Sequence, residues 1–451
     1  MTTPSEMRLS EVPGMPSPAM DLTYTTSIPI NGNTFSENQE IRIAMQCPTN
    51  GFVDLKRAYL KYKINNTSTG GNYFLDPLAG GAAVIDTLRI TGGNGALLEE
   101  VIHYNALYAV MNANKNKDVV SSIHNVYEGA STEPGVALKV KDNNTDAEMR
   151  GCTSITNAQS RVITHRPQSA FFNADRYMPL GYSQGLVNLS LTLAQNSTPF
   201  IVSNEDEANV AAYTVSDVEL HLPILQPGPE FAAMFRSAMS SGVPIQIHSV
   251  GIQNTQQALP TAATGPQTLT FSTRKRSVKS VMVAMRPSAN LTVDERASVS
   301  GFVNASCTAY NFSIGGLRLP ASQIKVETLI NGRDQGELLA NTQLALGHFS
   351  SDLRGISCVH WNGTGDVQTY TPEAAEHNTV CSKCVFALDL ESYNAAFAGK
   401  NLSGAGLPLV LHATVDGTNG AQANGALLLD LYIIHDVVYV MDSNGIINAN
   451  S

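Results

Sequence analysis

The sequence predicts an all-β protein built from two halves of similar layout. Glycine and proline contribute 35 and 21 of the 451 residues, a frequency typical of many short strands joined by turns and loops. Apolar residues make up 43% of the chain, which suits packed cores and excludes a disordered protein. Segments that alternate polar and apolar residues recur throughout, and this period of two is typical of strands with one buried face.

The first half contains several segments of this kind. In 54–64, Lys61 and Lys63 alternate with Leu60 and Tyr62, so one face of the expected strand is polar and the other apolar. The predicted strands of this half are 40–45, 54–64, 83–90, 186–193 and 214–222. Such alternation favours antiparallel sheets that bury one face and leave the other in water.

The second half repeats the pattern. Its last strand, 427–441, lies in the most apolar stretch of the chain, 426–441. Asp430, His435 and Asp436 interrupt this stretch, so we do not expect it to span a membrane. The predicted strands of this half are 243–253, 267–273, 278–285, 307–314, 324–330, 384–390, 407–415 and 427–441.

Few segments have the pattern of a helix. The clearest is 229–242, which begins with Pro229 and Glu230, ends with Gly242 and carries an apolar stripe. Two further helices are predicted at 99–111 and 336–346, each after a strand and a turn.

The order of these elements indicates a duplication. The apolar strand 189–193 resembles 409–413, and 218–222 resembles 430–434, at offsets near half the chain length. About eight strands per half fits a jelly roll, in which two four-stranded sheets pack face to face. We therefore expect an all-β fold of two tandem eight-stranded jelly rolls with few short helices and long loops. The expected divisions are a flexible N-terminal arm 1–21, a first jelly roll 22–226, a linking helix 227–243, a second jelly roll 244–445 and a C-terminal tail 446–451.

The charge of the chain limits its partners. The net charge is −10 and only 15% of residues are charged, which argues against nucleic-acid wrapping and against a polybasic membrane anchor. The first 20 residues lack the apolar core of a secretory signal and are expected to form a flexible arm.

One group of cysteines and histidines has the residue types of a metal site. It comprises Cys358, His360, His377, Cys381 and Cys384. Thiolates and imidazoles bind zinc tetrahedrally, but these spacings match no standard zinc finger. The alternative is a loop with incidental Cys and His residues or a disulfide, and we assign no metal or cofactor.

Two common catalytic motifs are absent from the sequence. It contains no His-Glu-x-x-His and no phosphate-binding loop, and we predict that the protein is not an enzyme. His103 is expected to be an interface or partly buried histidine rather than a base. His435 and Asp436 are expected to point to opposite faces of a strand and so form no dyad. The acidic pairs are interpreted as helix N-terminal or loop charges: Glu99, Glu100, Asp206 and Glu207.

Two further features have alternative interpretations. The basic run 274–276 with Lys279 is either a contact for an acidic partner, lipid or genome, or a solvated turn between strands, which we favour. Trp361, the only tryptophan, is either an exposed contact residue in an outer loop or part of a small core beneath that loop.

Several segments, taken in order, resemble a known family. They are Gly51–Lys63, Ile85–Met111, Ser216–Leu222, Leu269–Met285, Tyr310–Pro320, Phe386–Glu391, Leu402–Gly406 and Leu427–Gly445. Together they resemble the double jelly-roll major capsid proteins of icosahedral DNA viruses, of the polinton-like virus, virophage and nucleocytoplasmic large DNA virus type. The order of the segments and the duplicated layout carry the resemblance.

The resemblance implies a structural role in a virion capsid that assembles inside the host cell. Three copies would form a pseudo-hexagonal capsomer that tiles an icosahedral shell, with the N-terminal arm beneath it and the loops 112–185 and 347–383 facing outward. The implied partners are the chain itself as a homotrimer, neighbouring capsomers, minor capsid or cement proteins and, in viruses that have one, an internal membrane. No sequence-specific nucleic-acid binding is implied.

Two other functions remain as alternatives. A jelly-roll spike, penton or carbohydrate- or receptor-binding protein of a virion would share the β pattern and the long loops, although the duplication disfavours it. A glycoside-active β-sandwich enzyme would require a pair of acidic residues, and none is identifiable.

Overall fold

The structure is a computed structural model of the whole chain. It describes residues 20–451 except 70–71, 77, 117–118, 131–137, 141–153, 157, 203–210, 243, 260–264, 289–298, 301, 303–306, 327–335, 349–376, 380–384, 393–396, 405–406 and 416–425. Among these described residues, no helix is long and apolar enough to span a membrane.

The main strands of the first half form two sheets, with the orders β1-β14-β5-β11 and β3-β12-β7-β8. Their bounds are β1 Met20–Ser27, β3 Glu40–Ala44, β5 Tyr59–Asn66, β7 Ile85–Thr91, β8 Leu97–Val101, β11 Ser160–His165, β12 Asn188–Leu193 and β14 Tyr213–Pro227. All neighbours within the sheets are antiparallel, and β14 also pairs with β2 (Thr34–Ser36) and β4 (Phe52–Val53).

The main strands of the second half also form two sheets, with the orders β15-β23-β17-β21 and β16-β22-β18-β19. Their bounds are β15 Ile245–Leu259, β16 Gly265–Phe271, β17 Val278–Pro287, β18 Cys307–Ile314, β19 Leu317–Lys325, β21 Phe386–Asp389, β22 Leu409–Val415 and β23 Leu427–Met441. The short strand β24 (Ile447–Asn450) extends the first of these sheets by pairing with β23.

The two halves have the same topology. If the eight main strands of each half are numbered along the chain, both halves have one sheet of order 1-8-3-6 and one of order 2-7-4-5. This is the arrangement of a jelly roll, so the chain is a double jelly roll, as the sequence predicts. Smaller sheets join β6 (Asn72–Leu75) to β10 (Ser154–Thr156) and β13 (Phe200–Val202), and β9 (Leu138–Val140) to β20 (His377–Thr379).

Most predicted strands are confirmed within a few residues. In β5 the burial alternates strictly, with Leu60, Tyr62 and Ile64 buried, as the sequence pattern requires. Two predictions are wrong in detail. The segment before β5 is a 3-10 turn, η2 (Leu55–Arg57). The strand expected at 324–330 begins earlier, as β19, and ends at Lys325, while 327–330 lies outside the described residues.

The helices expected at mid-chain and in the second half are confirmed as α4 (Pro229–Ser240) and α5 (Gly336–Gly347). The helix expected at 99–111 is wrong at its start, because 97–101 is strand β8 and the helix α1 covers Tyr104–Ala113. His103 lies between them with a φ of 51°, so the backbone turns sharply there. The described residues also include a short helical segment formed by η4 (Val120–His124) and α3 (Asn125–Glu128).

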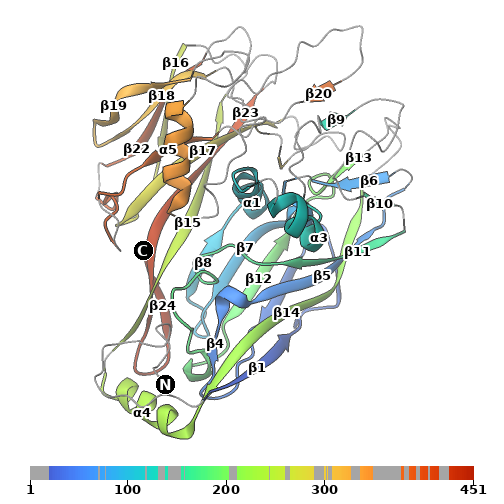
Figure 1. The fold of residues 1–451 in the computed structure, drawn as a ribbon, viewed down its shortest axis with the longest axis vertical. Helices are drawn as coiled ribbons and strands as arrows, with labels where there is room; N and C mark the ends of the chain where they lie inside the picture. Colours follow the sequence, from blue (N-terminus) through green and yellow to red (C-terminus); the bar gives the residue numbers. More distant parts are fainter. Residues whose placement is uncertain are drawn as a thin grey trace.

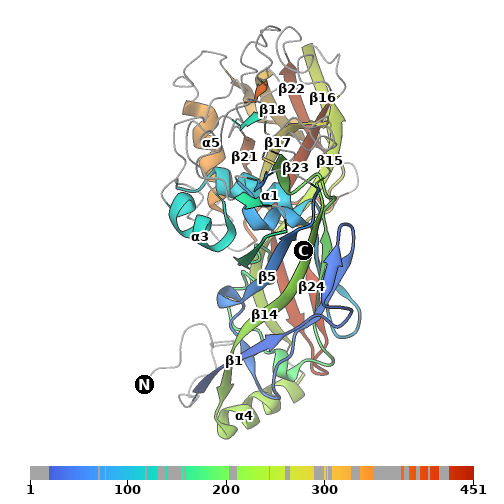
Figure 2. The same ribbon diagram turned by 90° about the vertical axis from the view of Figure 1, so that its right-hand side faces the viewer.

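The two jelly rolls lie one above the other along the long axis of the molecule (Figure 1). Helix α4, which links them, lies at one end beside the start of β1, and α1 lies at the level where the two halves meet (Figures 1 and 2). The second jelly roll has a core of its own between its two sheets. The core of the first jelly roll continues into residues of β15, β17 and β23, so the two jelly rolls share one packed junction.

Candidate assembly surfaces

The junction covers the outer face of the second jelly roll's β15-β23-β17-β21 sheet. Met282 on β17 and Tyr432 and Ile434 on β23 point away from the second core and are fully buried. They belong to the same apolar cluster as Leu98 of β8 and Phe171 of the loop after β11. As a result β23 is buried on both faces over most of its length.

Backbone of the first half approaches β15 closely at this junction. The Ser249 hydroxyl donates to the Ala170 carbonyl at 2.5 Å, and the Asp175 amide donates to the His248 carbonyl at 3.1 Å. Gly251 lies beside them, where an added Cβ would be 3.3 Å from the Ala170 Cβ and 2.8 Å from a Val437 methyl. Glycine at this position therefore permits the close contact.

A buried ion pair lies on the same covered face. The Arg286 guanidinium contacts the Asp430 carboxylate at 2.7 Å, and both side chains are almost fully buried. Burial alone would lower the pKa of Arg286, but the Asp430 carboxylate raises it above its usual range. The sequence analysis missed this pair, although one signal was present: a charged residue within a strongly apolar strand requires a partner, and both of these strands contain such residues.

A longer chain of alternating charges crosses the sheet nearby. Its successive pairs are Asp175–His248 at 3.1 Å, His248–Asp436 at 2.8 Å, Asp436–Lys279 at 3.6 Å, Lys279–Glu391 at 2.7 Å, Glu391–His348 at 3.1 Å and His348–Asp389 at 2.8 Å. Asp175 comes from the first jelly roll, so this chain ties the two halves together. Hydrogen bonds to Asp175 and Asp436 raise the pKa of His248 to about 9.

The serine, histidine and aspartate of this region do not form a catalytic triad. Ser277 donates to Asp436 at 2.5 Å, and Asp436 also contacts His248, so the aspartate lies between the other two. Activation of a serine requires the histidine to contact its hydroxyl, with the aspartate behind the histidine. The His435 imidazole instead contacts the Asp436 backbone carbonyl at 3.1 Å, and burial lowers the pKa of His435 to about 3.

A second buried polar cluster fastens α1 and α3 to the first jelly roll. Glu128 accepts from the Tyr108 hydroxyl at 2.6 Å and contacts His165 at 2.8 Å and His124 at 3.4 Å. Burial alone would raise the pKa of Glu128, but these two histidines lower it well below its usual range. His165 also contacts the Tyr104 hydroxyl at 2.7 Å, so the cluster holds both helices in place.

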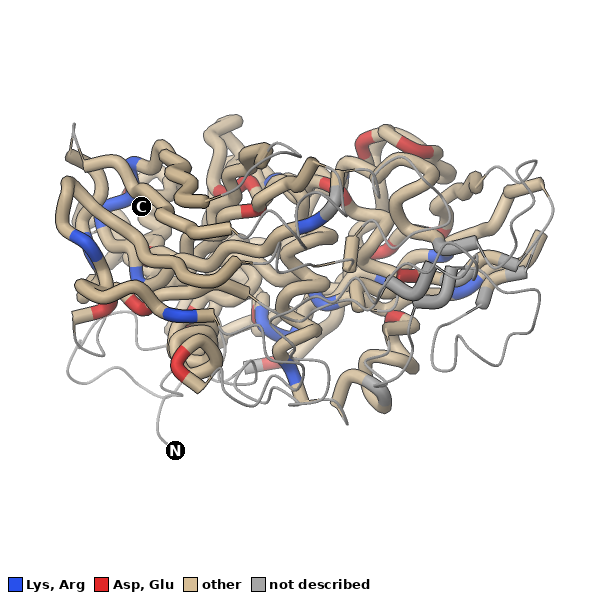
Figure 3. Tube along the Cα trace, turned by 90° about the horizontal axis from the view of Figure 1, so that it is seen from above, with Lys and Arg blue, Asp and Glu red and all other residues tan. Residues whose placement is uncertain are grey.

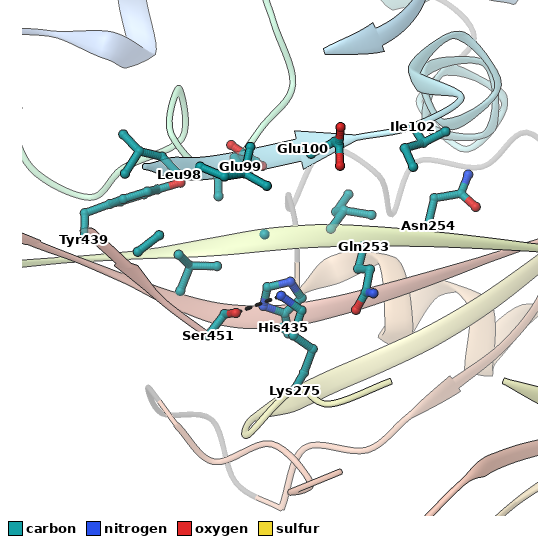
Figure 4. Close-up of a pocket in the computed structure, with 16 residues that line it drawn as sticks. Leu98, Glu99, Glu100, Ile102, Gln253, Asn254, Lys275, His435, Tyr439 and Ser451 are labelled. Carbon is teal, nitrogen blue, oxygen red and sulfur yellow. Dashed lines mark hydrogen bonds between the residues drawn. The ribbon is translucent and has the colours of Figure 1, made fainter. Parts of the chain in front are cut away.

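A hollow of about 280 Å³ lies at the edge of the junction, between β8 and β15. Figure 4 shows Glu99 and Glu100 on one side of it and Lys275, His435 and Ser451 on the other. The prediction that Glu99 is a helix or loop charge is wrong. Glu99 lies on β8, and its carboxylate is buried. It accepts hydrogen bonds from the backbone amides of Ala170 and Phe171 at 2.7 and 2.9 Å, and burial raises its pKa.

The equivalent outer face of the first jelly roll has no such cover. On the β1-β14-β5-β11 sheet, Lys61 pairs with Glu219 at 3.2 Å, and the Tyr59 ring stacks on His221 at 4.6 Å, all partly exposed. A hollow of about 390 Å³ opens on this face and is lined by residues of β5, β11 and β14 and of 28–33.

Apolar side chains gather around this uncovered face. Half of the exposed large apolar residues in the described chain lie on β1, at the hollow, on β11 or on the helical segment beside it: Leu22, Tyr24, Ile28, Val119, Ile123, Val126, Tyr127 and Val162. The helical segment lies next to β11, where the Arg161 guanidinium donates a hydrogen bond to the Asn125 carbonyl at 2.7 Å. Apolar groups collected in one region typically mark an interaction surface.

The opposite flank of the molecule is also exposed. In β19 only Ile324 is buried, whereas three of the five residues of the equivalent strand β8 are buried. All ten residues of α1 are buried, but of the twelve in α5 only Leu338, Thr342, Ala345 and Leu346 are. Figure 1 shows β19 on the side of the second jelly roll far from the first.

The sequence contains one group of cysteines and histidines with the residue types of a metal site. Cys358, His360, Cys381, Cys384 and the side chain of His377 lie outside the described residues. Trp361, Asp206 and Glu207 also lie outside them. Within the described part of the chain, no group of three metal-ligating side chains is positioned to hold an ion.

The basic run lies between β16 and β17, but its four side chains do not share one surface. Arg274 and Arg276 are exposed, Lys275 is half-buried and Lys279 is buried against Glu391. Figure 3 shows charged residues thinly scattered along the trace. His103 is partly exposed and contacts the Asp86 carboxylate at 3.2 Å.

No family model and no curated protein matches the sequence. The fold is similar to the folds of solved capsid-protein structures. PBCV-1 VP54, fitted into a cryo-EM reconstruction of the virophage Sputnik, gives a TM-score of 0.61 at 8% identity over 97% of this chain and 98% of that one. The Sputnik virophage structure gives 0.56 at 12% identity over 100% and 93%. The Faustovirus major capsid protein gives 0.56 at 10% identity over 95% and 92%.

These comparisons show that the chain has the double jelly-roll fold found in major capsid proteins. Because the similarity covers nearly the whole of both chains, it includes both jelly rolls and their relative arrangement. At such low identity the similarity concerns the fold alone.

Proposed function

We propose that this chain is a viral major capsid protein that trimerises into pseudo-hexagonal capsomers and tiles an icosahedral shell. The observation that carries the proposal is the similarity to major capsid proteins across both jelly rolls, with coverage above 90% of each chain. In this proposal the divisions are those expected from the sequence, namely 22–226 and 244–445 joined by a linking helix, with short segments at both ends.

The surfaces of the molecule are consistent with a structural rather than a catalytic role. A shell protein needs a rigid core and lateral faces that bind copies of itself. The shared junction supplies the rigidity, and the exposed apolar groups on opposite flanks supply faces for self-association. The proposed location is the virion capsid, with other copies, minor capsid or cement proteins and any internal membrane as neighbours.

Light scattering after gel filtration tests the proposal directly. We expect a mass near three times 48.1 kDa at micromolar concentration and physiological salt. Negative-stain images of concentrated protein are expected to show hexagonal particles or sheets of them. A stable monomer that forms no lattice would contradict the proposal, and specific glycan binding by such a monomer would favour a spike or receptor-binding protein instead.

A further inference from the structure

We propose that the side chains of Lys279 and Asp436 join through an amide bond, which the folded chain forms by itself with the release of one water molecule. The bond ties β17 to β23, which are neighbouring strands of the second jelly roll (Figure 1). It lies within one chain, so it does not depend on the proposed function. It goes beyond that function because it is a chemical modification of the single subunit.

The two reacting side chains lie in contact and are shielded from water. The Lys279 Nζ is 3.6 Å from the Asp436 Oδ1, and the two residues are 7% and 1% exposed. The register of β17 against β23 shifts between Val278 and Ser280, so Lys279 lies at an irregularity of the ladder. Such irregularities re-aim side chains. Exclusion of water favours the amide, because water is the reagent that would hydrolyse it.

A second carboxylate is placed to take the proton that keeps the lysine unreactive. The Glu391 Oε1 is 2.7 Å from the Lys279 Nζ, and the Glu391 side chain is buried. A protonated amine has no free electron pair, and an adjacent base activates it by removing a proton. The other carboxylate oxygen of Glu391 contacts the Nδ1 of His348 at 3.1 Å, and His348 is partly exposed. A proton accepted by Glu391 therefore has a route to solvent.

The other neighbours of Asp436 suit a carboxyl group that is attacked by a nucleophile. Its Oδ2 accepts hydrogen bonds from the Ser277 hydroxyl at 2.5 Å and the Phe397 amide at 3.0 Å. Donors at this oxygen stabilise the negative charge that grows on it during attack. The Oδ1 contacts the Nε2 of His248 at 2.8 Å. Because the pKa of His248 is about 9, its imidazole is protonated at neutral pH and can donate to the departing oxygen.

The reaction needs no reagent beyond these groups. The Lys279 nitrogen forms a bond to the carboxyl carbon of Asp436, and the bond from that carbon to Oδ1 breaks. The nitrogen loses two protons, one to Glu391 and one to the departing oxygen. His248 supplies the second proton of that oxygen, which leaves as water. Glu391 then releases its proton and His248 regains one through solvent, so the charges balance and nothing is oxidised or reduced.

The newly folded chain holds these groups as the ion pairs described above. Burial alone would raise the pKa of Asp436, but hydrogen bonds from His248 and Ser277 lower it, so the carboxylate is charged at neutral pH. Proton transfer must therefore precede the formation of the bond. We expect the amide to accumulate after folding, from a chain that first contains the ion pair.

Mass spectrometry of the denatured full-length chain tests the proposal. After prolonged incubation at physiological temperature, the wild type is expected to weigh one water molecule less than its sequence. A protease digest should contain a branched peptide that joins Lys279 to Asp436. Lys61→Arg is the control, because it alters the solvated Lys61–Glu219 pair of the equivalent sheet, and it should lose water as the wild type does. A wild type that keeps its full mass would overturn the bond, and a branch between other residues would overturn its position.

Two substitutions test the chemistry of the step. Glu391→Gln removes the base but keeps the shape of the side chain, and it is expected to retain its full mass. Asp436→Asn changes the leaving group from water to ammonia, so this variant should lose one ammonia molecule and reach the mass of the reacted wild type. Water loss from Glu391→Gln at the rate of the wild type would overturn the role of Glu391.

The same measurements separate this inference from the proposed function. A trimer whose chains keep their full mass would overturn only the amide bond. A stable monomer that loses water would overturn only the proposed function.

Discussion

The two jelly rolls share their strand order but differ in what covers them. Both have a sheet of order 1-8-3-6, yet the outer face of that sheet is packed in the second jelly roll and solvated in the first. The same difference separates the two helices that follow the fifth strand, because α1 is wholly buried and α5 is mostly not. Position in the topology therefore does not determine burial.

The charged residue types on the two sheets match their solvent exposure and not their position in the topology. The third and eighth strands of both jelly rolls carry a cross-strand ion pair on the outer face, Lys61–Glu219 in the first and Arg286–Asp430 in the second. The first pair is partly exposed to water, and the second is buried. An arginine in the buried pair is consistent with its planar, bidentate group, which satisfies a carboxylate better than lysine does.

Removing the cation from each pair gives the largest expected contrast. Arg286→Met leaves Asp430 buried without its partner and is expected to lower the free energy of unfolding by about 3–5 kcal/mol. Lys61→Met breaks a solvated pair and is expected to cost less than about 1 kcal/mol. Urea denaturation of the two variants measures both values.

The double variant Arg286→Met with Asp430→Leu serves as the control. It removes both charges from the covered face, so most of the stability lost in the single variant should return. Equal costs for Arg286→Met and Lys61→Met would show that the two faces do not differ in solvation.

Leucine truncation in the two equivalent helices is the next largest effect. Leu107 of α1 is fully buried, so Leu107→Ala is expected to lower the free energy of unfolding by about 3 kcal/mol. Leu344 of α5 is 51% exposed, and Leu344→Ala is expected to change the stability of the single chain by no more than about 0.5 kcal/mol. Similar losses for both would mean that α5 is covered within one chain.

Much of this fold was predictable from the sequence because period-two alternation reports a half-buried strand directly. In β5, for example, the apolar residues Leu60, Tyr62 and Ile64 of the pattern occupy buried positions. The helix at 99–111 was wrong because an apolar spacing of three and four also fits a strand followed by a helix. Only the backbone turn at His103, with its φ of 51°, separates the two, and the sequence carries no clear signal for it.

The candidate surfaces were less predictable because they depend on contacts between distant segments. The sequence pattern gives one buried face for each strand, but β23 is buried on both, since the first jelly roll covers its second face. The burial of Glu99 arises in the same way, from backbone amides of Ala170 and Phe171 far along the chain. A pattern of local periodicity contains no information on such packing between distant segments.

The smallest expected effect concerns the pH dependence of the junction. The folded pKa of His248 is about 9, above its ordinary value of 6.5, because Asp175 and Asp436 favour the charged form. Charged His248 therefore stabilises the folded protein, by an amount on the order of 1 kcal/mol because the group is partly exposed. This stabilisation is complete below pH 6.5, declines as the pH rises and is lost above about pH 9. The difference in unfolding free energy between the wild type and His248→Gln should follow this course in urea titrations between pH 6 and about 10. His221→Gln removes a histidine from the solvated face of the first sheet, where it contacts Glu219 at 2.9 Å, and should cost less than His248→Gln below pH 6.5. A difference for His248→Gln that stays constant across this range would show that the histidine does not hold the two jelly rolls together through its charge.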